Sequence, residues 1–523
     1  DVADRTQAAV WAIKKGLDEV KAANPDLAET AATWAFKSYA PPVVADPPAR
    51  LTRFQTAASR RRGEARATRE RLRIGMPRAL NMYSLGPLFS AYFESLGIPA
   101  NNLVWSDYTN EQLYREGGRR GSIDPCFPSK VGIPHVHNLL YQHHPKKPLD
   151  VIFFPMVDDL PSDLVGCQAH RACPTVTATP DAVKAAFTKE LDLFGEAGIA
   201  YLDPLVNPGD PRLFERQMFE AFAERLGLSE REHARAVAQG YAALDRFVNE
   251  IQRGQAREIL RRLEEEDRLG IVLLGRPYHN DPGLNHEILT EFQKLGYPVL
   301  TQASLPIDPE ILERLFGEEV RRGATPHALD VRDVWKNSYS ENTTQKIFAA
   351  KYTARHPNLV ALELSSFKCG HDAPIYTAVE EIVESSGTPY FSFKDIDENK
   401  PVGSIKIRVE TIGYFLGRYR EKLLDRRRRR DEVEARLAAY EAELRGTPAD
   451  PAGDREAATQ GVPADAARDR TDADRARTNA GRDPADAAAR RTPANVALQP
   501  GMDAGPERTT EGPPAEGIRE VVR

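Results

Sequence analysis

The alternation of short apolar segments with segments of helical period, from residue 73 to residue 393, constrains the fold more than any other feature. Two of the short segments, 150–154 and 359–364, are apolar at all but one position. Strands of this kind are typical of a parallel sheet that helices cover on both faces. We therefore predict an α/β fold. The predicted strands are 73–76, 103–105, 150–154, 200–202, 270–274, 297–300, 359–364 and 390–393. The predicted helices between them are 85–96, 129–141, 181–194, 285–295, 309–321, 342–356 and 375–385.

The two parts of this region repeat each other. A strand ends in a Gly-x-Pro turn at Gly75 in IGMPRALNMY and again at Gly275 in LLGRPYHNDP. A helix then ends in Leu-Gly-x-Pro at Gly97 and at Gly296, and the spacings agree within one residue. The repeat predicts two Rossmann-like parallel-sheet halves that face a cleft.

Changes in composition predict the domain boundaries. The tail from residue 446 is rich in Ala, Asp, Arg, Pro and Thr and has too few large apolar residues to offset its ordering entropy, so we expect it to be disordered. The predicted parts are a helical lead-in (1–69), a first half (70–210), a helical bridge (211–268), a second half (269–420), a charged helix (421–445) and the disordered tail (446–523).

The overall composition excludes several classes of protein. Only four cysteines occur in 523 residues, which argues against a secreted disulfide scaffold. A net charge of −6 gives no signal for nucleic acid, and no apolar run approaches the roughly 20 residues that span a membrane. No signal peptide is visible, so we expect a cytoplasmic protein. The chain begins with Asp1 rather than Met, which is typical of a fragment or a processed piece.

The four cysteines all fall on predicted loops. Cys126, Cys167, Cys173 and Cys369 lie near the starts of helices or beyond the carboxyl ends of strands, where sites form in open α/β sheets. Their spacing contains no Cys-x-x-Cys pair and matches neither a zinc ribbon nor a ferredoxin. Thiolates from separate loops, beside Pro and Gly, suit an iron–sulfur cluster. Inert buried cysteines and a redox pair remain open alternatives.

Polar residues near these loops have two interpretations each. Arg276, His279 and Asn280 follow the second Gly-x-Pro turn and could bind a phosphate or acyl-CoA group, or could cap the next helix. Asp372 could contact the ligands of a cluster without binding the cluster itself, or could be the N-cap of the helix 375–385. The histidines at 135, 137, 143 and 144 resemble a metal cluster on paper, but their Lys- and Pro-rich surroundings predict surface exposure.

Several strings in the expected order carry a family resemblance: IGMPRALNMY, IDPCFPSK, ACPTVTATPD, GRPYHNDPGLNHEI and SFKCGHDA. Through residues 70–420 and the lead-in, the chain resembles the large CoA-enzyme-activase-related proteins, a region similar in turn to the cluster-binding subunits of 2-hydroxyacyl-CoA dehydratases. The resemblance implies that Cys126, Cys173 and Cys369 bind an iron–sulfur cluster of the [4Fe–4S] type. Where related sequences often have another cysteine, this chain has Met156, so either Cys167 compensates or one iron stays open.

The same resemblance implies an electron-transfer or reductase module for anaerobic metabolism. The chain has no GxxxxGK[ST] phosphate loop, so the ATP-hydrolysing activase would be another domain or subunit. The implied partners are a low-potential donor such as ferredoxin or flavodoxin and an acyl-CoA or similar substrate. A radical 2-hydroxyacyl-CoA dehydratase-type subunit is one alternative, and a scaffold that has lost its cluster is another.

Overall fold

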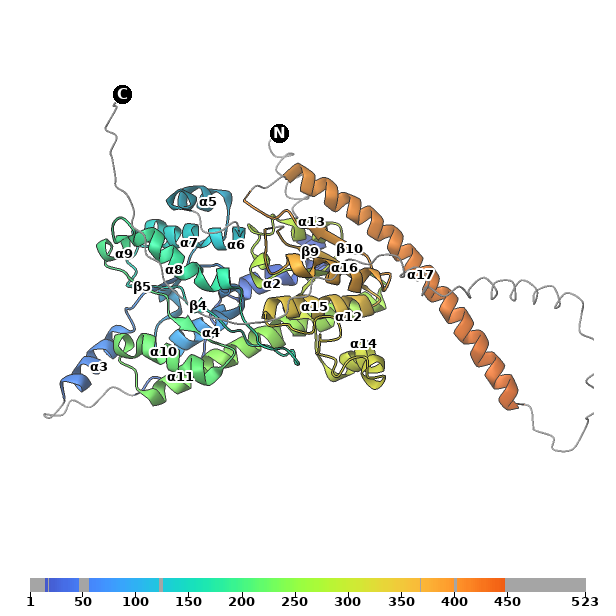
Figure 1. The fold of residues 1–523 in the computed structure, drawn as a ribbon, viewed down its shortest axis with the longest axis horizontal. Helices are drawn as coiled ribbons and strands as arrows, with labels where there is room; N and C mark the ends of the chain where they lie inside the picture. Colours follow the sequence, from blue (N-terminus) through green and yellow to red (C-terminus); the bar gives the residue numbers. More distant parts are fainter. Residues whose placement is uncertain are drawn as a thin grey trace, which may run out of the picture. The chain divides into compact units, whose positions relative to one another are not determined.

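The structure is a computed structural model that describes residues 15–16, 18–46, 56–121, 126–366, 368–398 and 402–446. The disordered tail predicted for 446–523 lies outside these residues, apart from its first residue. The chain divides into two compact units, 1–435 and 436–523, and both large sheets and all four cysteines belong to the first. Figure 1 shows the elements of the two halves on opposite sides of this unit, with α2 (Leu27–Trp34) between them.

Each half contains one four-stranded parallel sheet, which confirms the predicted α/β fold. The order is β2-β1-β3-β5 in the first sheet and β8-β7-β9-β10 in the second, so each half places its first strand between its second and third. The first sheet contains β1 (Ile74–Met76), β2 (Leu103–Trp105), β3 (Val151–Phe153) and β5 (Ala200–Leu202). The second contains β7 (Gly270–Leu274), β8 (Val299–Thr301), β9 (Leu359–Leu364) and β10 (Tyr390–Phe393). Two short strands that the sequence did not predict, β4 (Met156–Val157) and β6 (Leu205–Val206), pair in parallel.

In each sheet the first and third strands are neighbours. From the first strand the chain crosses the sheet in one direction to the second, and from the third strand it crosses in the opposite direction to the fourth. At such a switch point the connections leave in opposite directions and open a crevice beyond the carboxyl ends of the strands. The two central strands of each sheet are buried along their whole length, as expected where helices cover both faces. The loops after β3, β7 and β9 therefore lie where a site is expected.

The helices follow the predicted order, with shifted boundaries. In the first half they are α4 (Met82–Ser95), α5 (Glu111–Gly117), α6 (Phe127–Lys130), α7 (Gly132–Asn138), α8 (Pro174–Thr188) and α9 (Leu193–Glu196). The bridge contains α10 (Pro211–Leu226), α11 (Glu230–Asp245), the π-helix η4 (Arg246–Gln252) and α12 (Arg253–Glu265). In the second half they are α13 (Ile288–Lys294), α14 (Pro309–Arg321), α15 (Glu341–Arg355) and α16 (Tyr376–Glu384).

Three predicted helix boundaries were wrong. The helix predicted for 129–141 is α6, α7 and a π-helical turn, η3 (Leu139–His143). The helix predicted for 181–194 begins at Pro174 and ends at Thr188, because proline needs no N–H partner in a first turn. The charged helix predicted from residue 421 begins earlier, as α17 (Val402–Gly446).

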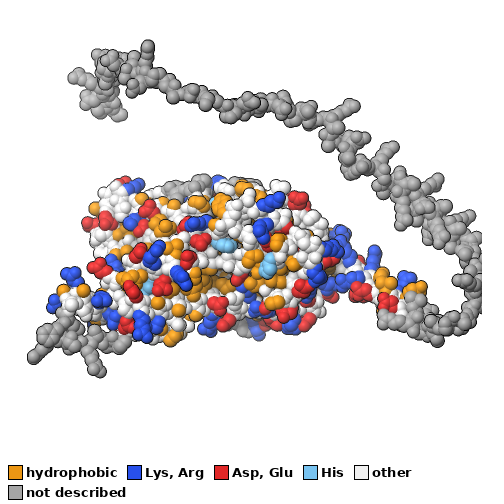
Figure 2. Space-filling view, turned by 60° about the horizontal axis from the view of Figure 1, so that its bottom comes forward, with side chains coloured by type: hydrophobic (Ala, Val, Ile, Leu, Met, Phe, Trp, Pro, Cys, Tyr) orange, Lys and Arg blue, Asp and Glu red, His pale blue; other side chains and the backbone are white. Residues whose placement is uncertain are grey.

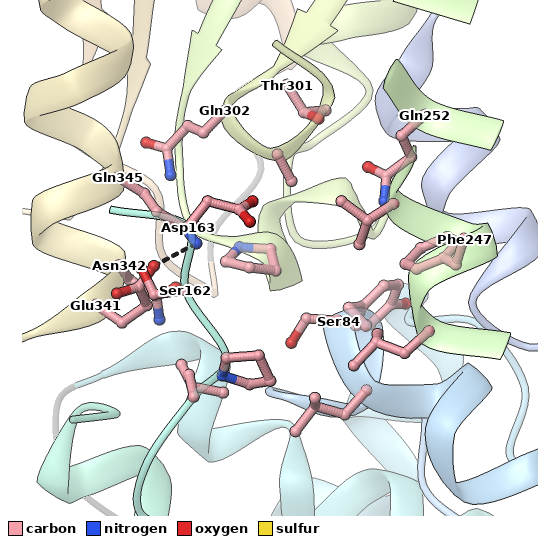
Figure 3. Close-up of a pocket in the computed structure, with 18 of the residues that line it drawn as sticks. Ser84, Ser162, Asp163, Phe247, Gln252, Thr301, Gln302, Glu341, Asn342 and Gln345 are labelled. Carbon is pink, nitrogen blue, oxygen red and sulfur yellow. Dashed lines mark hydrogen bonds between the residues drawn. The ribbon is translucent and has the colours of Figure 1, made fainter. Parts of the chain in front are cut away.

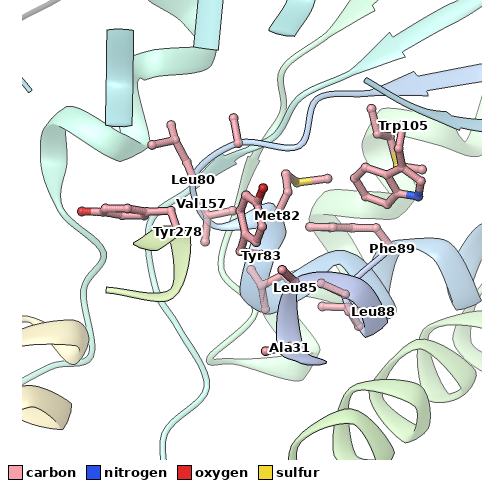
Figure 4. Close-up of a cluster of buried hydrophobic side chains, with 14 of the residues drawn as sticks. Ala31, Leu80, Met82, Tyr83, Leu85, Leu88, Phe89, Trp105, Val157 and Tyr278 are labelled. Atoms are coloured by element: carbon pink, nitrogen blue, oxygen red, sulfur yellow. The ribbon is translucent and has the colours of Figure 1, made fainter. Parts of the chain in front are cut away.

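One hydrophobic core runs through both halves. Figure 4 shows Leu80, Met82, Tyr83, Phe89 and Trp105 of the first half packed with Ala31 of α2 and Tyr278 of the second half. Because these side chains share one cluster, burial of apolar surface holds the two halves together. A second, smaller cluster lies around α12, α15 and β9.

The surface carries charges of both signs. On the face shown in Figure 2, acidic and basic side chains are interspersed over the body of the protein, and basic ones gather toward α17. The five consecutive arginines at 426–430 belong to that helix. Among the described residues, no helix is both long and apolar enough to cross a membrane.

Candidate functional site

Three of the four cysteines face the same region of the crevice. Cys126 directly precedes α6, Cys173 directly precedes α8, and Cys369 lies between β9 and the short helix η7 (Ala373–Ile375). All three are partly buried. Burial raises the pKa of Cys126, and the nearby sulfurs of Cys369 and Cys173 raise it further. The fold therefore brings two thiols of the first half within electrostatic range of one thiol of the second.

Hydrogen-bond donors lie close to two of these sulfur atoms. Cys126 and Cys173 are the N-cap residues of α6 and α8. The N–H and hydroxyl of Ser129 act to lower the pKa of Cys126, and the N–H groups of His371 and Asp372 act to lower the pKa of Cys369. These donors favour the thiolate forms of both residues and so partly offset the effect of burial.

Cys167 lies in a different environment. Burial raises the pKa of its thiol, and the other groups that act on it include Thr344, Glu341 and Asp330. Its sulfur lies 3.7 Å from the backbone oxygen of Val165 and packs against the smaller hydrophobic cluster. Cys167 is thus on the same predicted loop as Cys173 but does not share its neighbours.

Arg276 is the cation of this region. It is only 1% exposed, and its Nη2 donates to Oδ1 of Asp372 at 2.8 Å. Burial opposes its charge, but Asp372, Tyr278 and the sulfurs of Cys369 and Cys173 outweigh burial and hold the pKa of Arg276 well above its ordinary value. Its Nε and Nη1 have no hydrogen-bond partner among the described residues. A buried guanidinium with two unused donors beside thiols is ready to stabilise an anionic group.

A buried network of charges holds Arg276 in place. Nζ of Lys346 lies 2.9 Å from Oδ2 of Asp372 and 3.0 Å from Oε1 of Glu363, and each of these side chains is at most 1% exposed. Ser365 donates its hydroxyl to Asp372 at 2.6 Å. Burial opposes the charge of Asp372, but Arg276 and Lys346 outweigh it and lower its pKa far below the ordinary value. The predicted N-cap role of Asp372 is wrong, because its side chain makes no capping hydrogen bond.

His279 and Asn280 lie in the turn after β7, in the short helix η5 (Pro277–Asn280). Nδ1 of His279 accepts from the backbone N–H of Arg276 at 3.0 Å, so His279 fixes the turn that carries the arginine. Burial lowers the pKa of His279 to about 3, which keeps the imidazole neutral. Asn280 is buried and lines a cavity between the halves. A ligand role for these two residues stays a prediction.

The sequence interpretation missed several residues of the site. Tyr278 is buried beside the three cysteines, whose sulfurs act on its hydroxyl, and it stands inside the GRPYHND string. Glu363 is the one charged residue of the otherwise apolar strand β9, and that was the available signal. The expectation that His135 is exposed was wrong. It is fully buried, and its ring nitrogens lie 2.8 Å from Oγ of Ser106 and 2.9 Å from Oγ1 of Thr109.

The binding of an iron–sulfur cluster by these cysteines stays a prediction. No three His, Cys, Asp or Glu side chains of the described residues lie close enough to share one metal ion. An iron–sulfur cluster spreads its irons apart, so each cysteine can bind a different corner. Thiolates are the ligands that such clusters use, and the buried Arg276 offsets the negative charge they bring.

A family model matches part of the chain. Residues 73–305 match the family described as the CoA enzyme activase uncharacterised domain (DUF2229). The matched region runs from β1 to just beyond η6 (Gln302–Ser304), so it includes Cys126, Cys173 and Arg276 but not Cys369. Among curated proteins, none is similar enough in sequence to match the chain.

Proposed function

Because residues 73–305 match the CoA enzyme activase domain family, we propose that the chain is the iron–sulfur module of an ATP-driven reductase system. Cys126, Cys173 and Cys369 would bind the cluster, of the [4Fe–4S] type. The observation that carries this proposal is that the thiols of Cys126, Cys173 and Cys369, from both halves, lie within electrostatic range of one another, with the buried Arg276 in range of Cys173 and Cys369. In the reducing cytoplasm, thiols in such a position stay available as metal ligands.

Burial and charge around the cysteines support this role. Each of the three thiols is partly buried, which limits the access of water and oxygen to whatever they bind. A cluster held by thiolates is anionic, and its stability depends on nearby positive charge and hydrogen-bond donors. Arg276 offers both, because its charge is fixed by Asp372 and two of its nitrogens have no partner among the described residues.

Several buried side chains would hold Arg276 in a fixed position beside the cluster. Lys346, Asp372 and Glu363 fix the position of Arg276, and the turn that contains His279 presents it to the cysteines. The bound cluster would supply one-electron transfer at low potential. The partners of this module would be an ATP-hydrolysing activase and a donor such as ferredoxin or flavodoxin, and an acyl-CoA or similar compound would receive the electron.

A second candidate function rests on the position of Cys167. With Cys167 among Thr344, Glu341 and Asp330, the three remaining cysteines leave one corner of a four-iron cluster without a thiolate. Such an open corner could bind a substrate oxygen, as a radical 2-hydroxyacyl-CoA dehydratase-type subunit requires. Turnover of a 2-hydroxyacyl-CoA by the activated protein would separate this candidate from plain electron transfer.

The test of the proposed function is an anaerobic preparation analysed for iron, acid-labile sulfide and electron paramagnetic resonance. About four irons and four sulfides per chain are expected, and Cys126→Ser, Cys173→Ser and Cys369→Ser should each lose most of them, because serine is a poor substitute for thiolate. A colourless protein after anaerobic reconstitution would instead support the third possibility, a scaffold that has lost its cluster.

A further inference from the structure

A cavity of about 280 Å³ lies between the two halves. Its lining comes from the start of α4, the loop 160–163, the end of α11 and the π-helix η4 on one side. On the other side it comes from the turn at Gly275, from β8 and η6, and from the start of α15. Its size is at the lower end of ligand pockets, which begin at roughly 300 Å³. Figure 3 shows the polar side chains that surround it.

Three buried carboxamides line this cavity from three separate elements. Gln252 ends η4, Gln302 begins η6 and Asn342 lies in the first turn of α15, and they are 2%, 8% and 3% exposed. Among their polar atoms, Oε1 of Gln302 is completely buried and has no hydrogen-bond partner among the described residues. Buried polar atoms almost always have a partner, so this oxygen indicates a group in the cavity that donates to it.

The carboxylates that line the cavity outnumber the arginines, which disfavours an anionic ligand. Asp163, Asp245 and Glu341 contribute three carboxylates to its lining. Of the two lining arginines, Arg253 already donates to Asp163 at 2.6 Å, and Arg276 is paired with Asp372. A phosphate or carboxylate entering here would face more negative than positive charge, whereas a neutral ligand would not.

The rest of the lining is apolar. Leu85, Leu160, Leu244 and Phe247 line the cavity, and all four are buried. In Figure 3, Phe247 and Gln252 extend from the same helix, whereas Gln302 and Asn342 come from the second half. Carboxamides therefore face the cavity from both halves, and the apolar side chains between them can pack against a hydrocarbon group.

We propose that this cavity binds a small neutral molecule in which a carboxamide or lactam is joined to an apolar group. The amide of the ligand would donate to and accept from Gln252, Gln302 and Asn342, and its apolar part would pack on Phe247 and the leucines. This site goes beyond the proposed function and does not depend on a cluster. Arg276 lines the cavity and also acts on Cys369 and Cys173, so a bound ligand would lie beside the cysteine region.

The test compares two probes of nearly equal shape, phenylacetamide and phenylacetate, on the full chain as purified. Saturation-transfer NMR and titration calorimetry should show that the amide binds at least tenfold more tightly than the carboxylate. Gln302→Leu and Asn342→Leu should each weaken the binding of phenylacetamide about threefold to tenfold, because each removes a hydrogen bond and keeps the volume. The exposed Gln112, which donates to Glu116, provides the matched control as Gln112→Leu.

Three outcomes would overturn the proposal: neither probe binds, both bind equally, or the two leucine variants bind the amide as tightly as the wild type. The first outcome together with higher thermal stability of Gln302→Leu would show that only water occupies the cavity. If one variant fails to fold, the other tests the same contact from a different element. The measurements need no iron, so their failure is distinct from failure of the proposed function.

Discussion

The two halves share one fold, and a buried position in the same turn of each shows how they differ. The turn after the first strand reads Gly75-Met76-Pro77 in the first half and Gly275-Arg276-Pro277 in the second. Met76 is 0% exposed and belongs to the large hydrophobic core, whereas Arg276 is 1% exposed and pairs with Asp372 beside the cysteines. The repeated fold thus provides the scaffold, and the departure from the repeat provides the charge on which chemistry can depend.

The largest expected effect comes from breaking the charge network of the second half. Asp372→Leu leaves Arg276 without its partner and Lys346 with only Glu363, and all of these groups are buried. An uncompensated buried charge costs about 3–5 kcal/mol. Denaturant unfolding should show a loss of this size in the free energy of unfolding.

The matched substitution in the first half is Met76→Leu. It exchanges one core side chain for another of similar volume and should cost less than about 1.5 kcal/mol. If Asp372→Leu is no more destabilising than Met76→Leu, the network contributes little, and the contrast between the halves is wrong as stated.

A pH titration of stability sharpens the comparison, because each half contains a buried histidine with a strongly lowered pKa. Burial lowers the pKa of His135 in the first half and of His279 in the second from 6.5 to about 3. Between these values the unfolded chain binds a proton that the folded chain does not, so each histidine makes stability fall as the pH falls from 6.5 toward 3. The contribution approaches about 1.4 kcal/mol per pH unit for each group.

The variants His135→Gln and His279→Gln separate the two contributions. Each should flatten the decline in the free energy of unfolding below pH 6.5, measured by denaturant unfolding at a series of pH values. Asp281 and Asp26 act in the opposite sense, because burial raises their pKa values, and they remain unchanged in both variants. A slope that neither variant alters would show that both histidines are protonated in the folded protein.

Arg276→Met makes the second half resemble the first at the position where they differ. Since the positive charge stabilises a cluster more as it gains an electron, its removal should lower the reduction potential by about 60 mV, equivalent to roughly 1.4 kcal/mol. Potentiometric titration followed by electron paramagnetic resonance measures this shift. Arg276→Lys keeps the charge and is the control. An unchanged reduction potential in Arg276→Met would show that Arg276 does not act on the cluster.

The sequence predicted the strands better than the site, for a physical reason. β7 and β9 were predicted at their observed bounds, because a buried parallel strand is a contiguous apolar run. The meeting of Cys126 and Cys173 with Cys369 was expected from strand ends and resemblance, and their role as ligands stays a prediction. The pairing of Lys346 with Asp372 and Glu363 could not be predicted, because it exists only once α15 packs on β9.

The burial of His135 could not be predicted from the sequence either. Its sequence surroundings suggested an exposed helix end, and local composition carried no sign of Asp281, which lies 146 positions further along the chain. Thr109 contacts both residues: it lies 2.9 Å from Nε2 of His135, and its hydroxyl donates to Asp281 at 2.6 Å. The burial of His135 therefore depends on the docking of the two halves, which a reading of one segment cannot include.

The smallest expected effect is that of Cys167→Ser, and it decides how many thiolates the site has. The thiol is partly buried beside Thr344 and Asp330, and serine should change the free energy of unfolding by about 0.5 kcal/mol or less. Iron content and the electron paramagnetic resonance spectrum should match the wild type, whereas Cys173→Ser, a change only six positions away, should lose the iron. That contrast would leave one corner of the cluster open and favour a catalytic role over plain electron transfer. Equal loss of iron in both variants would mean that Cys167 moves to join the other three cysteines on cluster binding, and a closed site with four thiolates would then favour electron transfer.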